Sequence, residues 1–243
     1  MTLPLKALIH KIAGYIIDLV LPQSCIGCKA PGVALCGVCK EQVSARSLGC
    51  VLCNFRNKTG VICRECKPKN SMLSHVVSVG LYDGTLKQAI RALKYRGRSN
   101  MAKPLGELLA KQFIEWNSGK EDVNSYVAVP IPLHPTKEQM RGFNQSALLG
   151  KNFAEITGIA VLADALTKTK DTAPQARTLV RADRILNTQG AFAADPAALA
   201  PHRNKTIILI DDVATTGATL HDASRALADA GATRIIGLVV AHG

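Results

Sequence analysis

The chain has 243 residues, 47% of them hydrophobic, which suffices for one full α/β domain plus a small accessory module and argues against a disordered chain. Aromatic residues make up only 4%, which argues against single-stranded nucleic-acid binding by aromatic stacking. The formal charge is +12, and such a basic excess is typical of proteins with phosphate-bearing partners, although ordinary soluble proteins also carry it.

Residues 1–22 predict an amphipathic helix, because apolar residues recur along them at helical spacing. Lys6, Lys11 and Asp18 interrupt the apolar run, so the segment is too short and too charged to span a membrane. No small-x-small cleavage site follows, which argues against a secretory signal. We expect the helix to dock on the protein's own surface, with contact of residues 3–20 with a membrane surface as the alternative.

Residues 23–69 contain all eight cysteines in four C-x-x-C pairs, and 7, 10 and 9 residues separate successive pairs. Each C-x-x-C turn places two sulfurs on one side of a tight knuckle, and two knuckles complete a tetrahedral site for zinc. Sequential pairing gives two sites of four cysteines each, and a cross-braced pairing also fits the spacing. Because four thiolates leave no open coordination position, we predict a structural role, with iron–sulfur clusters or redox dithiols as alternatives. The predicted ligands are Cys25, Cys28, Cys36, Cys39, Cys50, Cys53, Cys63 and Cys66.

The cysteine module also bears on localisation and charge. Metal thiolates favour a reducing cytoplasm over an oxidising compartment, with attachment at the inner face of the membrane as the alternative. Residues 1–69 hold ten Lys or Arg and three Asp or Glu, a net charge of +7. Eight thiolates with two Zn²⁺ ions contribute −4 and lower this charge to about +3, so the basic module is a weak indication of nucleic-acid binding.

From residue 71 onward, apolar runs alternate with amphipathic helices, a pattern that predicts βαβ units and a parallel sheet. We therefore assign residues 71–243 to a second, α/β domain. The expected elements, in chain order, are a strand at 75–81, helices at 85–96 and 104–117, a strand at 126–131, a helix at 145–157, a strand at 159–162, an irregular basic stretch at 164–190, a strand at 206–210, a helix at 217–230 and a strand at 235–240.

The segment 206-TIILIDDVATTGATL-220 is the strongest functional signal. Asp211 and Asp212 follow an apolar strand, and parallel α/β sheets bind ligands at the carboxyl ends of their strands. The next residues are small or carry hydroxyls and lead into a helix N-terminus, which favours an anion. They are Ala214, Thr215, Thr216, Gly217, Ala218 and Thr219. We expect this loop to hold a phosphate while the carboxylates accept from ribose hydroxyls; the alternative is an ordinary turn with an N-cap threonine.

This segment resembles the signature of type I phosphoribosyltransferases: an apolar strand, two acids, two variable residues and Thr-Thr-Gly-x-Thr. The resemblance implies phosphoribosyl pyrophosphate (PRPP) with Mg²⁺ as the ligand. Together with the cysteine pairs, the segments 93-LKYRGR-98, 130-PIPLHPTKEQMRGFNQS-146 and 184-RILNTQGAF-192 are similar to the ComF/GntX family over almost the whole chain. That family implies a double zinc ribbon joined to a type I phosphoribosyltransferase domain. It also implies handling of incoming single-stranded DNA on the cytoplasmic side in natural transformation, or growth on external DNA or gluconate.

The pyrophosphate loop departs from the transferase pattern. The resemblance places it at residues 130–135, where Leu133-His134-Pro135 stands in place of the Asp-Ser-Gly of amidophosphoribosyltransferases. Pro135 has no N–H to donate, so the loop is short of amide donors. The candidates to supply positive charge there, or toward a DNA backbone, are Lys137, Arg141, Lys94 and Arg184. A solvated basic surface is the alternative interpretation.

Three functions fit these features. We favour a protein with a phosphoribosyltransferase fold that binds PRPP or a related sugar phosphate and acts with the DNA-uptake machinery. The second is an active transferase with an unknown acceptor, in which Asp211 and Asp212 stabilise a cationic ribosyl transition state as catalytic residues. The third is a zinc-ribbon nucleic-acid-binding protein with a non-catalytic transferase domain. No base-recognition aromatic residue or general base is evident beside the pocket, which argues against the second.

Overall fold

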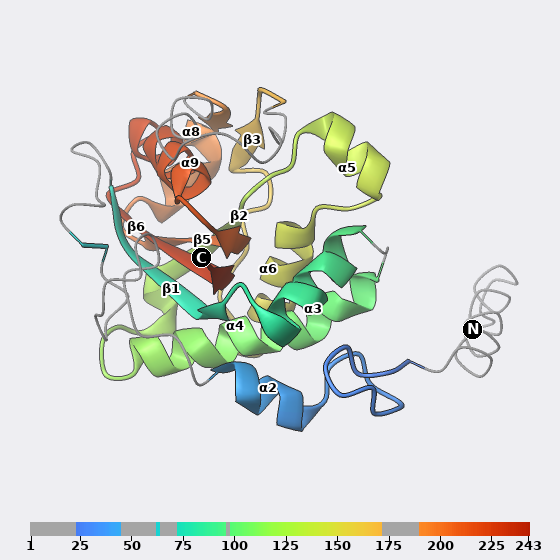
Figure 1. The fold of residues 1–243 in the computed structure, drawn as a ribbon. Helices are drawn as coiled ribbons and strands as arrows, with labels where there is room; N and C mark the ends of the chain where they lie inside the picture. Colours follow the sequence, from blue (N-terminus) through green and yellow to red (C-terminus); the bar gives the residue numbers. More distant parts are fainter. Residues whose placement is uncertain (1–22, 45–61, 64–71, 96–97, 172–189) are drawn as a thin grey trace, which may run out of the picture.

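Figure 1 shows a computed structural model of the chain, in which residues 23–44, 62–63, 72–95, 98–171 and 190–243 are described. Several predicted features lie outside these residues, namely the helix of residues 1–22, Cys50, Cys53, Cys66 and Arg184. Within the described part of the chain, no helix combines the length and the apolar character that a membrane span requires.

A four-stranded parallel sheet lies at the centre of the fold, with the strand order β1-β6-β5-β2. The strands are β1 (Leu73–Leu81), β2 (Tyr126–Pro130), β5 (Thr206–Ala214) and β6 (Arg234–His242). β5 and β6 are central and are buried along almost their whole length, as expected of parallel strands that are covered on both faces. The predicted α/β class with a parallel sheet is therefore confirmed, and the carboxyl ends of its strands meet at one edge.

Helices cover both faces of this sheet (Figure 1). One face carries α3 (Gly84–Tyr95), α4 (Ala102–Asn117) and α6 (Gln145–Thr157), which pack against Ile208 and Ile210 of β5. The other face carries α9 (Ala218–Asp229) and the antiparallel pair of β3 (Leu166–Lys168) and β4 (Phe192–Ala194), which pack with Ile207 and Leu209. Because side chains alternate along a strand, β5 supplies apolar residues to both cores.

The remaining elements are short. They are α2 (Gly37–Ser44), α5 (Pro135–Arg141), α8 (Pro196–Leu199) and the 3-10 turns η1 (Ser99–Met101), η2 (Val123–Ser125) and η3 (Ala200–His202). A proline occupies an early position of α5, where its missing N–H costs no hydrogen bond, and Gly142 ends that helix with a φ of 83°.

Most predicted elements are present, but the short elements α2, α5, β4 and α8 were not predicted, and three predicted segments differ. The strand predicted at 159–162 is a single bridge between Val161 and Ala128, and the stretch predicted as irregular contains β3. The strand predicted to end at Ile210 continues to Ala214, because β6 keeps pairing beside it as far as His242. Both acids therefore lie within a strand rather than directly after one.

Helices α4 and α6 approach each other closely, and the approach depends on a glycine. A Cβ atom added to Gly106 of α4 would lie 2.5 Å from the Cβ of Asn152 on α6, too short for any real contact. In α6 itself, Gly150 has space around it, since the nearest atoms to an added Cβ lie at 3.8 Å. Only the first of these two glycines is therefore required by packing.

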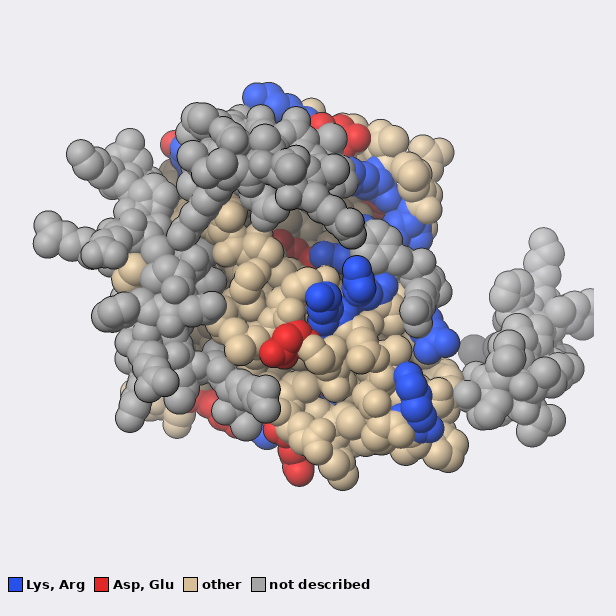
Figure 2. Space-filling view, viewed as in Figure 1, with Lys and Arg blue, Asp and Glu red and all other residues tan. Residues whose placement is uncertain are grey.

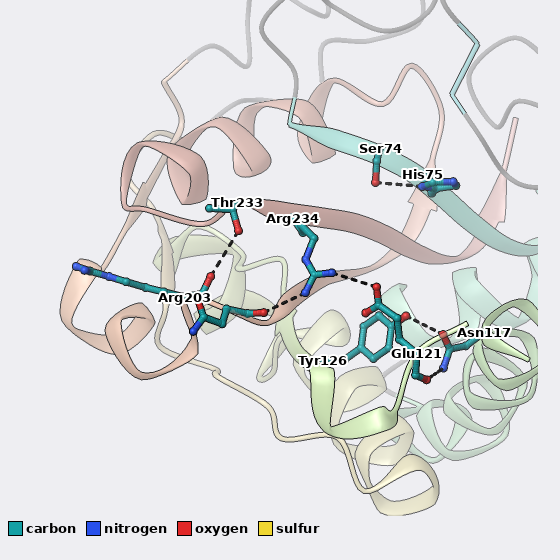
Figure 3. Close-up of polar contacts among 9 residues, drawn as sticks. Ser74, His75, Asn117, Glu121, Tyr126, Arg203, Thr233 and Arg234 are labelled. Carbon is teal, nitrogen blue, oxygen red and sulfur yellow. Dashed lines mark hydrogen bonds and ion pairs between the residues drawn. The ribbon is translucent and has the colours of Figure 1, made fainter. Parts of the chain in front are cut away.

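Polar contacts tie together the amino-terminal edge of the sheet (Figure 3). Arg234, which begins β6, donates to a Glu121 carboxylate oxygen at 3.1 Å and to the Asn204 carbonyl at 3.0 Å. The hydroxyl of Tyr126, which begins β2, donates to Asn117 of α4 at 2.7 Å. Burial, followed by the charge of Glu121, raises the pKa of Tyr126 to about 12, so its hydroxyl stays protonated. These contacts fix the loops on the side away from the acids.

Trp116 lies near this same edge, in the last turns of α4. Its ring packs edge-on against His75 of β1, with ring centroids 5.6 Å apart, and contacts Phe113 one turn earlier. The Lys120 ammonium lies 3.5 Å from its centroid, which is cation–π geometry. The indole therefore joins α4 to the outer strand β1.

Candidate functional site

Asp211 and Asp212 lie near the carboxyl end of β5, and both are buried, with 7% and 3% of their surface exposed. The backbone N–H of Asp212 donates to the Asp211 carboxylate at 2.8 Å. Burial, followed by the neighbouring charge of Asp212, raises the pKa of Asp211 to about 7, while Lys94 opposes the shift. The two carboxylates thus form a closely coupled pair in a poorly hydrated place.

The first residues of α6 hold both carboxylates in position. Ser146 Oγ, fully buried, donates to Asp211 Oδ1 at 2.9 Å, and Gln145 Nε2 donates to Asp212 Oδ1 at 3.3 Å. Asn144 begins the helix, because its side chain accepts from the Ser146 N–H at 3.0 Å. This role was not predicted from the sequence, although all three residues lie in the segment 130–146.

Lys94 and Arg141 also reach this network. The ammonium of Lys94, in the last turn of α3, forms an ion pair with Asp212 Oδ2. Arg141, the last residue of α5, donates to Gln145 Oε1. Both cations were predicted to serve a pyrophosphate or a DNA backbone, and here they are joined, directly or through Gln145, to the acid at the end of β5.

The predicted phosphate loop connects β5 to α9. Gly217 adopts the left-handed conformation, with a φ of 73°, and this turn lets the chain enter α9 at Ala218. The Ala218 N–H donates to Thr216 Oγ1 at 3.4 Å. Thr215 is exposed, whereas Thr216 and Thr219 are half-buried. Backbone N–H groups at the start of a 12-residue helix, with two hydroxyls beside them, are suited to an anion.

Two further lysines, Lys137 of α5 and Lys168 of β3, lie near the site. Lys137 forms an ion pair with Asp171 at 2.7 Å. Burial, followed by the charge of Lys137, lowers the pKa of Lys168, while Asp211 raises it. Lys168, which was not predicted as a site residue, is therefore close enough to Lys137 and Asp211 for both charges to shift its pKa. Figure 2 shows Lys and Arg side chains gathered beside a hollow in this face, with an acidic side chain deep inside it.

Asp222 of α9 has a structural role. Its two carboxylate oxygens each accept a backbone N–H at 2.8 Å, from Gly190 and Ala191. Arg225, one turn later in α9, pairs with the same carboxylate. Asp222 thus fixes the chain that leads into β4. Both of its carboxylate oxygens already accept hydrogen bonds from the protein.

The first half of the cysteine module brings four sulfurs together. The Sγ atoms of Cys25, Cys28, Cys36 and Cys39 all lie within 4.8 Å of one another. Zn–S bonds of about 2.3 Å in a tetrahedron require sulfurs about 3.8 Å apart, so a small contraction suffices for zinc. The grouping agrees with sequential pairing of the first two C-x-x-C pairs. Cys63, half-buried, is the one predicted ligand of the second site within the described residues.

Backbone donors support the thiolate form at this site. Burial alone would raise the pKa of Cys25, but N–H groups of Cys36, Cys28 and Gly27 lower it to about 6. Burial and the neighbouring sulfurs raise the pKa of Cys39 to about 12. Opposite pKa shifts are expected where several thiols lie close together, because adjacent thiolates repel one another. A bound cation offsets this repulsion.

The cysteine cluster is packed on the α/β domain. Cys25 and Cys39 belong to the same hydrophobic cluster as Leu86 and Leu93 of α3. A Cβ added to Gly27 would lie 2.7 Å from Cys39 Sγ and 3.1 Å from the methyl group of Thr85, so the knuckle closely approaches α3. The cluster thus touches the first turn of the helix whose last turn carries Lys94.

Comparison with known proteins identifies the domain that contains the acid pair. Residues 160–243 match the family model described as "Phosphoribosyl transferase domain". This range includes β5, both acids and the loop of residues 214–219. A solved structure titled "Structure of the allosteric regulatory enzyme of purine biosynthesis" is similar to 57% of this chain at 22% identity and a TM-score of 0.35, and the match covers 25% of that structure's chain.

Relatives are similar to much more of the chain. A "DNA utilization protein YhgH" of Salmonella typhimurium is 29% identical over 224 residues, which is 89% of this chain and 96% of the relative. "Competence protein ComFC" of Bacillus subtilis is 28% identical, over 75% of this chain and 72% of the relative. "Competence protein F" of Haemophilus influenzae is 27% identical, over 71% and 75%. Over most of its length the chain is therefore similar to proteins named for competence and DNA utilization, and its residues 160–243 match a phosphoribosyltransferase domain.

Proposed function

We propose that this protein binds PRPP, or a related sugar phosphate, at the carboxyl end of β5, and that it acts in the handling of incoming single-stranded DNA. The observation that carries the first part is the sequence of features along β5 and α9. Two adjacent carboxylates are followed within a few residues by a Thr-Thr-Gly turn and the start of a helix. The names of the relatives, which refer to DNA utilization and competence, support the second part.

The phosphate end of the ligand is assigned to the loop of residues 214–219. Its backbone N–H groups and threonine hydroxyls are donors, and the start of α9 favours negative charge. The ribose end is assigned to Asp211 and Asp212, whose oxygens accept hydroxyl hydrogens. Carboxylate oxygens also suit Mg²⁺, which when bound with PRPP would offset the charge of the pyrophosphate.

The pyrophosphate end is assigned to the basic side of the site, on α3 and α5. Lys94 and Lys137 are each held by an acid, Asp212 and Asp171, and each ion pair leaves room for rearrangement because a lysine stem is long and flexible. A pyrophosphate carries more charge than a single carboxylate and is therefore a stronger partner for both ammonium groups. Lys168, on which the charges of Lys137 and Asp211 both act, is a further candidate.

The first test is calorimetric titration of the full chain with PRPP and Mg²⁺. We expect the Asp211→Asn/Asp212→Asn variant to lose at least about tenfold in affinity, since it loses both anionic acceptors while keeping their shape. Asp164→Asn is the matched control, because Asp164 is exposed and should leave the affinity unchanged. Absence of PRPP binding by the unmodified protein, or equal binding by the double variant, would contradict the assignment.

The role with DNA is tested separately, by binding of labelled single-stranded DNA over a range of salt concentrations. A phosphate-backbone interaction weakens as salt rises. If PRPP and the DNA share the basic residues, PRPP will compete with the DNA. DNA binding that persists unchanged in the Asp211→Asn/Asp212→Asn variant and ignores PRPP would favour a zinc-ribbon nucleic-acid-binding protein. Release of pyrophosphate with a nucleobase or amine would establish an active transferase.

A further inference from the structure

The acid pair is already occupied by a cation that belongs to the chain. Asp212 Oδ2 is paired with the Lys94 ammonium, while Oδ1 accepts from Gln145. Asp211 accepts from Ser146 of α6 and from the Asp212 backbone N–H. Because both carboxylates are nearly fully buried, two negative charges there need a positive one, and α3 supplies it.

We propose that Lys94 is an internal counterion that excludes divalent metal from the acid pair until a polyphosphate ligand draws its ammonium away. The proposal concerns the regulation of the site and rests on the proposed function only for the identity of that ligand. A lysine ammonium and a divalent cation would both bind the same oxygen, Asp212 Oδ2. They repel each other strongly at such a short distance, so one occupies the place at a time.

The placement of Lys94 suits such an exchange. It lies in the last turn of α3, its side chain is 21% exposed, and its partner Asp212 is almost completely enclosed. The ammonium can therefore swing toward solvent and an incoming phosphate without opening the core, while Asp212 stays fixed by Gln145. Lysine is suited to this movement because its charge is compact and its stem rotates freely.

The exchange has a direct consequence for the order of binding. Free metal binds weakly, because the Lys94 ammonium already offsets the negative charge of the acid pair. A metal bound to a polyphosphate arrives with anionic oxygens that accept the displaced ammonium, so metal and ligand bind together. The site thereby distinguishes a metal–polyphosphate complex from free metal, without any further residue.

The test measures Mn²⁺ alone, without PRPP, by the loss of its free electron paramagnetic resonance signal on binding to the full chain. We expect the Lys94→Met and Lys94→Gln variants to bind Mn²⁺ at least about tenfold more tightly than the unmodified protein. Arg91→Met is the matched control, because Arg91 is exposed on the same helix one turn earlier and should change nothing. Lys94→Arg keeps the charge and should still exclude the metal.

The gain in affinity must also depend on the acids. Adding Asp212→Asn to Lys94→Met should abolish the gain, which separates this site from the cysteine cluster. Two variants at Lys94 guard against a single misfolded one, and circular dichroism checks that each is folded. Folded Lys94→Met and Lys94→Gln proteins that bind Mn²⁺ no more tightly than the unmodified protein would overturn the proposal. Because no PRPP is present, this result is independent of whether PRPP is the ligand.

Discussion

The Asp211 carboxyl is buried beside a second carboxyl, and this placement opposes folding whenever both are ionised. Its folded-state pKa of about 7 lies above the ordinary value of 3.8. Between these two values the folded chain binds more protons than the unfolded chain, so the stability falls as pH rises through that range. A site that is costly to the fold in this way is typical of binding and catalytic centres.

Asp211→Asn should therefore stabilise the protein at pH 8, because the amide keeps its acceptor oxygen for Ser146 and carries no charge. The gain should shrink toward pH 5, where the native carboxyl is already protonated. Thermal unfolding of both proteins at a series of pH values measures this difference. A lower melting temperature for the variant at pH 8 would show that the charge of Asp211 is instead stabilised by Lys94.

The acids and the loop after them were predictable from the sequence because they are contiguous along the chain. Their partners were not. Ser146 and Asp211 are 65 residues apart, and Gln145 and Asp212 are 67 apart, so only the fold brings them together. Likewise, Lys94 was predicted to contact a pyrophosphate or a DNA backbone, but nothing in the sequence showed that its ammonium pairs with Asp212.

At the scale of elements, α6 links the core to the site, since its first residues hold the acids and its middle packs on α4. The contact at Gly106 sets the separation of these two helices. The elements β3 and α5 were not predicted from the sequence. With three and seven residues, they are too short to establish a periodic hydrophobic pattern. The long apolar strands and amphipathic helices, in contrast, were predictable.

Gly106→Ala should destabilise the protein by roughly 1–3 kcal/mol, since its new Cβ must push α6 away at Asn152. Gly150→Ala is the matched comparison. It should be neutral or stabilise by up to about 1 kcal/mol, because alanine favours the helix and its Cβ makes only ordinary contacts. Chemical denaturation gives both values. Equal effects of the two substitutions would mean that the helices adjust without cost at Gly106.

At the scale of the whole molecule, the cysteine cluster and the α/β domain share one hydrophobic core. Ile26 and Leu35 of the knuckles belong to the same cluster as Leu93 and Leu105. The ion pair between Lys40 of α2 and Glu107 of α4 adds a polar contact. Because these contacts are continuous, loss of the metal should lower the stability of the α/β domain as well as that of the cysteine module.

We expect zinc to bind Cys25, Cys28, Cys36 and Cys39, and removal of the metal by a chelator to lower the melting temperature by about 5 °C or more in one transition. Metal analysis should show that Cys25→Ser/Cys28→Ser loses about one equivalent of zinc relative to the unmodified protein. A separate early transition, with the main one unshifted, would indicate that the cysteine module unfolds independently of the α/β domain.

Trp116 is the single tryptophan of the chain, and its place at the amino-terminal edge of the sheet decides what its fluorescence reports. The indole contacts β1 and α4, while the acids lie at the opposite ends of the strands. Its fluorescence should therefore report unfolding of the central sheet. A nucleotide-like ligand bound at the acids would not contact the indole and should not quench it directly. A ligand that changes this emission would therefore act through a rearrangement at the amino-terminal edge of the sheet, rather than by contact with the indole.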